Sequence, residues 1–374
     1  MELENRTPVA AEILAVEVHE AVPRMGFLVA KATFRFTEDG SVELEREDPL
    51  PIFEADEELE DGFFLPRDTI PKNDEAFEVM LVGHAHSPSG RPVERMHVTL
   101  GVGDTYQHLL VTGDRWWRIQ LGSDGWPDPS ACVPTDPAPF TRLPLDWTRS
   151  WGGEAEVLID HDSPLTFADP LNGLGKGFDP TPAARGFVEH VGAPEGFPVI
   201  EWVRALPNVE DPLSPITHWE DEPDPAGWAP LPISSGIRAM AIPMPDSEED
   251  ASLFASLERP QKVPPEILHR AHPDWVLPST PPAGASIFLR GLVAGVSELA
   301  FPLPSLRVLA DYEVGEHSGT RELRPDTLVL LPDERRFYLV YRSIFRYNFD
   351  PMSERCFRLR LATGWYSPIQ SSQT

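Results

Sequence analysis

The sequence of 374 residues has few cysteines and no long apolar run. Only Cys132 and Cys356 are present, far fewer than a secreted, disulfide-stapled scaffold would carry. The first residues lack the basic start and apolar core of a signal peptide. No apolar run reaches the roughly 18 residues that a membrane span needs. We therefore expect a cytoplasmic protein with reduced thiols and no membrane contact.

Positive charge is also scarce. The chain has 31 Lys and Arg residues against 60 Asp and Glu residues, which gives a formal net charge of −29. Nucleic acids and anionic membranes are bound through basic surfaces, so this balance argues against both as partners. The acidity has two interpretations: it serves solubility alone, or it serves contact with a basic partner such as a cationic toxin.

Residue patterns that would identify a catalytic or metal site are scarce as well. His84 and His86 would point the same way on a strand, but no Cys pair or helical His pair accompanies them, so we interpret them as structural or surface residues. The glycine-rich run 173–177 lacks the spacing and context of a phosphate-binding loop. We therefore expect no catalytic residues, no metal and no cofactor.

Proline and tryptophan, in contrast, are abundant. The 42 prolines are roughly twice the usual share of about 5%. Trp, Gly and Pro gather in three blocks, VTGDRWW (111–117), LPLDWTRSWGG (143–153) and LPNVE (206–210). Fixed backbone shapes and large aromatic contact areas indicate a scaffold that holds something.

Alternating apolar residues predict strands on both sides of these blocks. Residues 27–36 alternate clearly, and 93–121 predict a meander whose third strand would be Trp116–Leu121. Residues 327–345 predict two strands about a turn at 332–334. Further strands are expected at 42–44, 77–82, 286–292 and 306–310.

Helix is expected to be minor. One helix is predicted to begin at Asp246 or Ser247 and to end before Pro260, and a second, short one covers 265–271. We expect a mainly β protein of antiparallel sheets in sandwich-like halves, with long Pro/Gly/Trp-rich loops. Its parts would be an N-terminal antiparallel β unit (1–121), a loop-rich motif region packed on it (122–245) and a C-terminal β unit with one or two short helices (246–374).

The blocks, in this order, resemble a bacterial family of domains of unknown function associated with type VI secretion. The resemblance covers roughly residues 20–350, and Trp151 stands where the family usually has Phe. The residues that carry it, structural or partner-binding, are Lys31, Asp68, Lys72, Asp74, Gly113, Asp114, Arg115, Trp117, Trp151, Gly152, Gly153, Pro207, Asn208, Glu210 and Arg342.

Roles for these residues follow from their chemistry. Gly152 and Gly153 suit backbone turns, while Trp117 and Trp151 suit core packing. Arg115 suits stacking or ion pairing. Asp114 fits a turn that binds the backbone. Two roles remain open for Asp68, Lys72 and Asp74, which could form a buried ion network or a polar loop.

The resemblance implies a cytoplasmic accessory protein. Such proteins are thought to act as adaptors or chaperones that bind an effector and help to load it onto the VgrG spike or its PAAR tip. The alternative, from a different class, is an unrecognised hydrolase or an immunity-like inhibitor that acts on the toxin. An enzyme should have a deep pocket lined by titratable groups, and an adaptor a broad apolar or acidic face.

Overall fold

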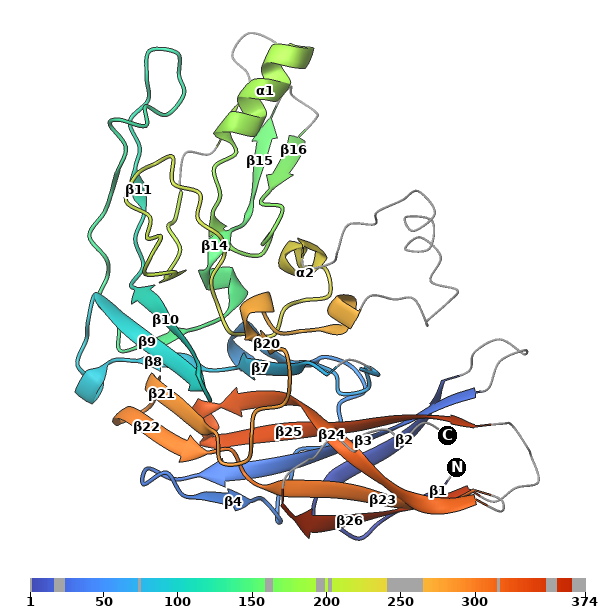
Figure 1. Cartoon of the computed structure of the whole chain (residues 1–374). Helices are drawn as coiled ribbons and strands as arrows, with labels where there is room; N and C mark the ends of the chain where they lie inside the picture. Colours follow the sequence, from blue (N-terminus) through green and yellow to red (C-terminus); the bar gives the residue numbers. More distant parts are fainter. Residues whose placement is uncertain are drawn as a thin grey trace.

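A computed structural model describes most of the chain. The described residues are 2–16, 24–72, 75–158, 164–192, 199–200, 204–240, 265–314, 317–347 and 355–364. They form a mainly β structure with several antiparallel sheets and little helix, as the sequence predicts (Figure 1).

The larger sheet has ten strands and forms the lower part of the molecule in Figure 1. Its long strand β3 (Arg24–Phe36) buries neighbouring residues on both faces, since Val29 and Ala30 are fully covered. The main order is β1-β26-β23-β24-β25-β3-β2, with β4 on β3, β7 on β24 and β20 on β7. These strands are β1 (Glu2–Asn5), β2 (Ala10–Val16), β4 (Val42–Leu44), β7 (Phe77–Leu81), β20 (Val276–Leu277), β23 (Leu306–Val314), β24 (His317–Leu331), β25 (Arg336–Tyr347) and β26 (Arg355–Thr363).

The second sheet has five strands in the order β19-β10-β9-β21-β22. Phe301 of β22 stacks on Phe36, with ring centroids 4.7 Å apart, and on Phe337 at 5.5 Å, so the two sheets share one hydrophobic core. Strands from the first and last thirds of the chain lie in both sheets. The five strands are β9 (Arg95–Val102), β10 (Thr105–Thr112), β19 (Val209–Glu210), β21 (Ser286–Val293) and β22 (Val296–Pro302).

The middle of the chain forms an irregular layer above these sheets in Figure 1, green to yellow. It contains the helices α1 (Thr181–Val191) and α2 (Gly236–Met240). The small sheets of the molecule pair β11 (Trp117–Arg118) with β12 (Val133–Pro134), β8 (His84–His86) with β13 (Arg142–Pro144), β14 (Trp151–Gly152) with β17 (Lys176–Gly177), β15 (Glu154–Leu158) with β16 (Pro164–Ala168) and β18 (Val199–Ile200), and β5 (Glu57–Glu58) with β6 (Phe64–Leu65).

The third strand predicted for the meander is wrong. The chain leaves the sheet after β10, and Trp117–Arg118 pairs with β12 instead. Gly113 explains the departure: a Cβ there would lie 1.8 Å from the carbonyl oxygen of Ala138, so only glycine permits this approach. The free edge of β10 is taken by β19, which brings Val209 and Glu210 to Val111 and Leu110.

The predicted strand pair over 327–345 is confirmed, with a single 3₁₀ turn at Pro332–Glu334 between β24 and β25. The short helix predicted over 265–271 is a 3₁₀ turn at Pro265–Leu268, and the helix predicted after Asp246 lies outside the described residues. Helix α1 was not predicted, because Pro182 and Gly186 weaken its periodic pattern. Every helix of the described ranges is too short or too polar to cross a lipid bilayer.

Candidate functional site

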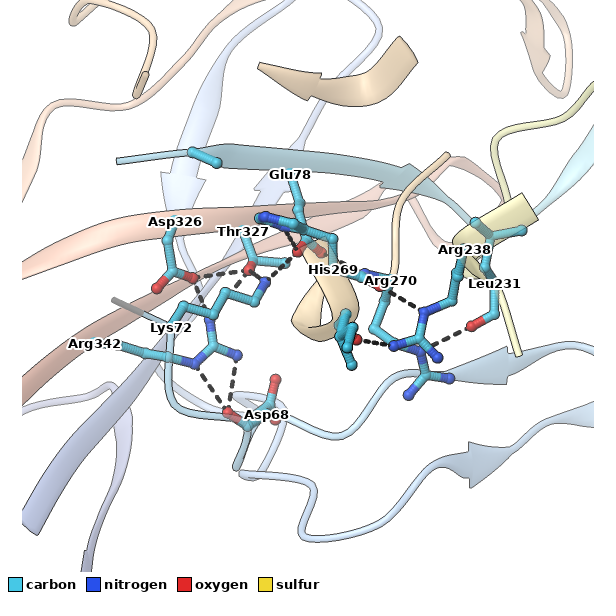
Figure 2. Close-up of polar contacts among 12 residues, drawn as sticks. Asp68, Lys72, Glu78, Leu231, Arg238, His269, Arg270, Asp326, Thr327 and Arg342 are labelled. Carbon is cyan, nitrogen blue, oxygen red and sulfur yellow. Dashed lines mark hydrogen bonds and ion pairs between the residues drawn. The ribbon is translucent and has the colours of Figure 1, made fainter. Parts of the chain in front are cut away.

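The motif residues fall into two groups in space. Four of the predicted residues lie in or beside the large sheet, ten lie together where the three sequence blocks meet, and Asp74 lies outside the described residues. The first group we call the charge network; it consists of Lys31, Asp68, Lys72, Glu78, His269, Asp326, Thr327 and Arg342. Figure 2 labels all of these residues except Lys31. The second, the turn assembly, consists of Gly113, Asp114, Arg115, Trp117, Arg149, Trp151, Gly152, Gly153, Lys176, Pro207, Asn208 and Glu210.

Lys31 and Asp68 form a fully buried ion pair. The Lys31 Nζ lies 2.5 Å from Asp68 Oδ2, and the two side chains are 0% and 1% exposed. The ammonium also donates to the carbonyl of Pro51 at 2.7 Å and lies 3.5 Å from the ring centroid of Phe53. Burial lowers the pKa of Lys31 to about 8, although Asp68 partly opposes this shift. The pair ties β3 to the segment that leads to β7.

Arg342 of β25 joins this segment to β24 (Figure 2). Its Nη2 and Nε donate to the carbonyl oxygen of Asp68 at 2.8 and 3.0 Å. Its Nη1 donates to the Asp326 carboxylate and, at 3.1 Å, to the hydroxyl of Thr327. The guanidinium is buried together with the side chain of Asp326.

Lys72 and Glu78 form the next buried pair. Lys72 Nζ lies 2.7 Å from Glu78 Oε1 and donates to Thr327 Oγ1 at 2.9 Å. His269 Nδ1 lies 2.5 Å from the same Glu78 oxygen, and the backbone N–H of Arg270 donates to the other at 3.1 Å. Burial disfavours the charge on Glu78, but Lys72 and His269 outweigh that effect and hold its pKa below the ordinary value.

The charge network therefore compensates its charges internally. Each carboxylate carries a cation or a set of N–H donors. The members of the network come from β3, the 68–72 segment, β7, β24, β25 and the 265–270 segment. Charged side chains sealed from water are tolerated only when they are paired in this way. The geometry favours a structural role: the network fixes one arrangement of strands that are distant in sequence.

In the turn assembly, Arg115 forms a buried ion pair with Glu210 of β19. Arg115 Nη2 lies 2.5 Å from Glu210 Oε2, and the side chains are 4% and 1% exposed. Glu210 Oε1 accepts the backbone N–H of Ile216 at 2.9 Å. The sequence left stacking and ion pairing open for Arg115, and the structure shows an ion pair. The contact fastens the LPNVE block to the VTGDRWW block.

The carboxylate of Asp114 binds three side chains, where the sequence predicted a contact with the turn backbone. Its Oδ1 accepts from Asn208 Nδ2 at 3.1 Å, from Arg149 Nη1 at 3.3 Å and from Lys176 Nζ at 3.4 Å. The side chain of Asp114 is 48% exposed, so this carboxylate is the most accessible member of the assembly's ion pairs. Asn208 also donates to the carbonyl of Thr112 at 2.8 Å. Three motif blocks meet at this one oxygen.

Gly152 and Gly153 lie close against neighbouring backbone, next to the buried Trp151. Gly152 and Gly153 have φ angles of +129° and +105°. A Cβ on Gly152 would lie 2.1 Å from the carbonyl oxygen of Asn172, and one on Gly153 would lie 2.5 Å from that of Gly175. Trp151 packs in a small core with Trp117 and Trp219. The predicted roles of the glycines and of the two Trp residues agree with this geometry.

Gly152→Ala is expected to destabilise the fold by about 1–3 kcal/mol, because alanine is strained at this φ and its methyl group meets the Asn172 carbonyl. The measurement is the free energy of unfolding in urea. Gly173→Ala is the matched control, since nothing lies within 4 Å of a Cβ there. Equal stabilities of the two variants would contradict this account.

A cavity of about 210 Å³ opens beside these glycines. Gly152, Gly153, Lys176 and Asp179 contribute to its lining, with Arg204. Arg204 lies over Trp219, 4.4 Å from the ring centroid, and donates to the carbonyl of Gly177 at 2.5 Å. Burial lowers the pKa of Arg204 to about 10, although Asp179 opposes this shift. The cavity thus combines cations with a carboxylate and could hold a small polar group.

Comparison with known proteins places the chain in a family. Residues 22–342 match the family described as uncharacterized protein conserved in bacteria (DUF2169). The chain belongs to this DUF2169 family. Neither the curated proteins nor the solved structures gave a match. The matched range of this DUF2169 protein contains every motif residue from Lys31 to Arg342.

His84 and His86 of the DUF2169 protein meet a shared carboxylate. His84 Nδ1 lies 2.6 Å from Asp333 Oδ2, and His86 Nε2 lies 2.6 Å from Asp333 Oδ1. Arg142 also approaches His84 Nδ1, at 3.1 Å. The described residues contain no group of three or more His, Cys, Asp or Glu side chains that could hold a metal ion. The contacts join β8 to the turn between β24 and β25 and agree with the structural interpretation.

The pKa of Asp333 gives a pH test of this contact. Burial opposes the charge, but His84 and His86 outweigh it and hold the pKa below the ordinary value. The resulting stability is fully present above the unfolded pKa of about 3.9 and is lost as the pH falls through the folded pKa. The difference in unfolding free energy between wild type and Asp333→Asn should therefore shrink below about pH 4. Urea titrations across this range check it, and a constant difference would argue against the contact.

Several site residues escape sequence reasoning because their partners are distant in the chain. Glu78 and His269 are 191 residues apart. Arg204 and Trp219 are brought into contact by the path of the loops in the irregular layer, which has no local periodicity. The sequence offers one usable signal, which is a charged residue inside an apolar strand. Lys31 and Glu78 both stand in such runs, and both are fully buried. An interior charge of this kind requires a partner.

Proposed function

We propose that this protein is a cytoplasmic adaptor of bacterial type VI secretion. It binds an effector protein and helps to load it onto the VgrG spike or its PAAR tip. Membership of the bacterial DUF2169 family is compatible with this role, and the order of motif blocks in the sequence supports it.

The observation that carries the proposal is the placement of exposed apolar side chains. Among the large apolar residues that are exposed in the described ranges, all except Tyr106 lie between Trp116 and Met240. Leu213, Met240 and Ile233 are 89%, 74% and 64% exposed. Exposed apolar groups gathered on one part of a soluble protein are typical of protein-binding surfaces.

The irregular layer that bears these side chains is held from within. The Arg115–Glu210 ion pair, the Asp114 contacts and the turns at Gly152 and Gly153 fix its loops. A surface that is already ordered loses little conformational entropy on binding, so it holds a partner segment at low cost. The net charge of −29 favours a basic effector. The attraction between the acidic protein and such an effector should weaken as the salt concentration rises.

Deletion of the gene tests the proposal. Delivery of the cognate effector should stop, while the purified effector should keep its toxic activity when this protein is added. Unchanged delivery would reject the adaptor role. Loss of effector activity on mixing would instead support an inhibitor, and chemical modification of the effector would support an enzyme.

A further inference from the structure

We infer that a groove beside α2 is the docking site for an extended segment of a partner protein that alternates basic and apolar residues. The groove has a volume of about 380 Å³ and lies between α2 and the 3₁₀ turn Pro273–Trp275 (α2 is labelled in Figure 1). This inference rests on the proposed adaptor function and specifies the surface and the chemistry of its partner.

The groove has an apolar wall. Leu171 and Ile237 line it, together with Met240, whose side chain is 74% exposed. Pro225 and Ala226 add to the apolar lining. A partner that covers Met240 removes apolar surface from water, which favours an aliphatic anchor in the bound segment.

Its rim is acidic. The carboxylates of Asp211, Asp224 and Asp274 belong to the lining. Two basic residues must be considered with this rim: His272 belongs to the lining, and Arg238 belongs to α2. Arg238 of α2 is engaged, because it donates to the backbone carbonyls of residues 233, 267 and 269. Burial lowers the pKa of His272, although Asp274 and Asp224 oppose this, so His272 is neutral near pH 7. The rim therefore favours Lys or Arg side chains.

The groove lining includes a side-chain amide of fixed orientation. Gln107 lines it, and the Oε1 of this residue accepts both the Trp228 and the Trp275 indole N–H at 2.6 Å. These two bonds set the orientation of the amide and leave the Nε2 hydrogens for an acceptor. A peptide carbonyl is such an acceptor, which favours a protein segment over a simple cation.

A second copy of the chain fits this groove poorly. Each copy carries a net charge of −29, so two copies repel one another. A basic partner is attracted by the same negative charge. The groove also lies on the irregular layer that bears the exposed apolar side chains, so one bound segment can continue onto that surface.

Fluorescence anisotropy with labelled peptides tests the groove directly. The probes are a short peptide that alternates Leu and Lys, one that alternates Leu and Glu, and one that alternates Ser and Lys. Wild type should bind the Leu/Lys peptide most tightly. The triple variant Asp211→Asn, Asp224→Asn, Asp274→Asn should weaken this binding by about tenfold, and Met240→Glu should weaken it through loss of the apolar anchor.

A variant of equal net charge serves as the control. Asp104→Asn, Asp136→Asn and Glu43→Gln change three exposed carboxylates outside the groove, and they should leave binding within about twofold of wild type. Circular dichroism and thermal melts establish that all variants fold. Equal binding by the groove variant and the control variant would overturn the inference.

Co-purification with the products of neighbouring genes separates this inference from the adaptor proposal. A partner captured by wild type and by the control variant, but lost by the groove triple variant, supports both. A partner retained by the groove variant overturns the groove and leaves the adaptor standing. Absence of any partner rejects the adaptor, and the peptide measurements then decide on the groove alone.

Discussion

Arg342→Met is expected to lower the free energy of unfolding by about 3–5 kcal/mol, because it leaves the Asp326 carboxylate buried without its cation. The same substitution removes both donors to the carbonyl oxygen of Asp68 (Figure 2). Urea denaturation of wild type and variant measures the loss.

Two further variants make this result specific. Arg360→Met breaks an ion pair with Asp311 in which the side chains are 48% and 42% exposed, so it should cost under about 1 kcal/mol. The double variant Arg342→Met, Asp326→Leu removes both charges and should be more stable than Arg342→Met alone. If Arg342→Met cost no more than Arg360→Met, the charge network would not hold the sheet together.

Trp151→Ala is expected to cost about 3–5 kcal/mol, the range for a large buried aromatic side chain. Trp151 is 4% exposed, lies 5.6 Å from the Arg204 guanidinium and packs with Trp117 and Trp219. Its removal would open a cavity at the centre of the turn assembly. The measurement is again the free energy of unfolding.

Trp116→Ala provides the aromatic control. Trp116 is 45% exposed, so its removal should cost under about 1 kcal/mol. A loss under about 1 kcal/mol for Trp151→Ala, combined with loss of partner binding, would give Trp151 a different role. Trp151 would then anchor a partner at an interface, and it would not serve to stabilise the free protein.

The regular part of the fold could be predicted from the sequence because its strands alternate. Residues 27–36 lie in β3, 77–82 cover β7, and 327–345 cover the end of β24 and most of β25. Periodicity reports only local structure, however. The place of β7 beside β24, in parallel, and of β19 beside β10 depends on contacts between distant residues, which no local pattern contains.

The candidate site could be predicted only in part for the same reason. Glycine and tryptophan identify the turn assembly, because few other residues take φ angles such as that of Gly152 or fill the volume of Trp151. The partners of the charged residues could not be predicted. Lys72 lies near Glu78 in sequence and in space, but its second contact is Thr327, 255 residues away.

The buried ion pairs of this protein support an exposed surface. Ion pairs inside the sheets and turns hold loops that sequence periodicity leaves undefined. Those loops carry apolar side chains and carboxylates outward, at Met240 and Asp224 among others. A rigid acidic surface with apolar groups suits a basic protein partner, and this is the link between the fold and the proposed adaptor role.

The measurement that tests this role most directly is co-purification of the protein with each neighbouring gene product, followed by sizing of any complex. The account predicts a stable complex with an effector, VgrG or PAAR protein, one that weakens as salt concentration rises. No complex with any of them would contradict it.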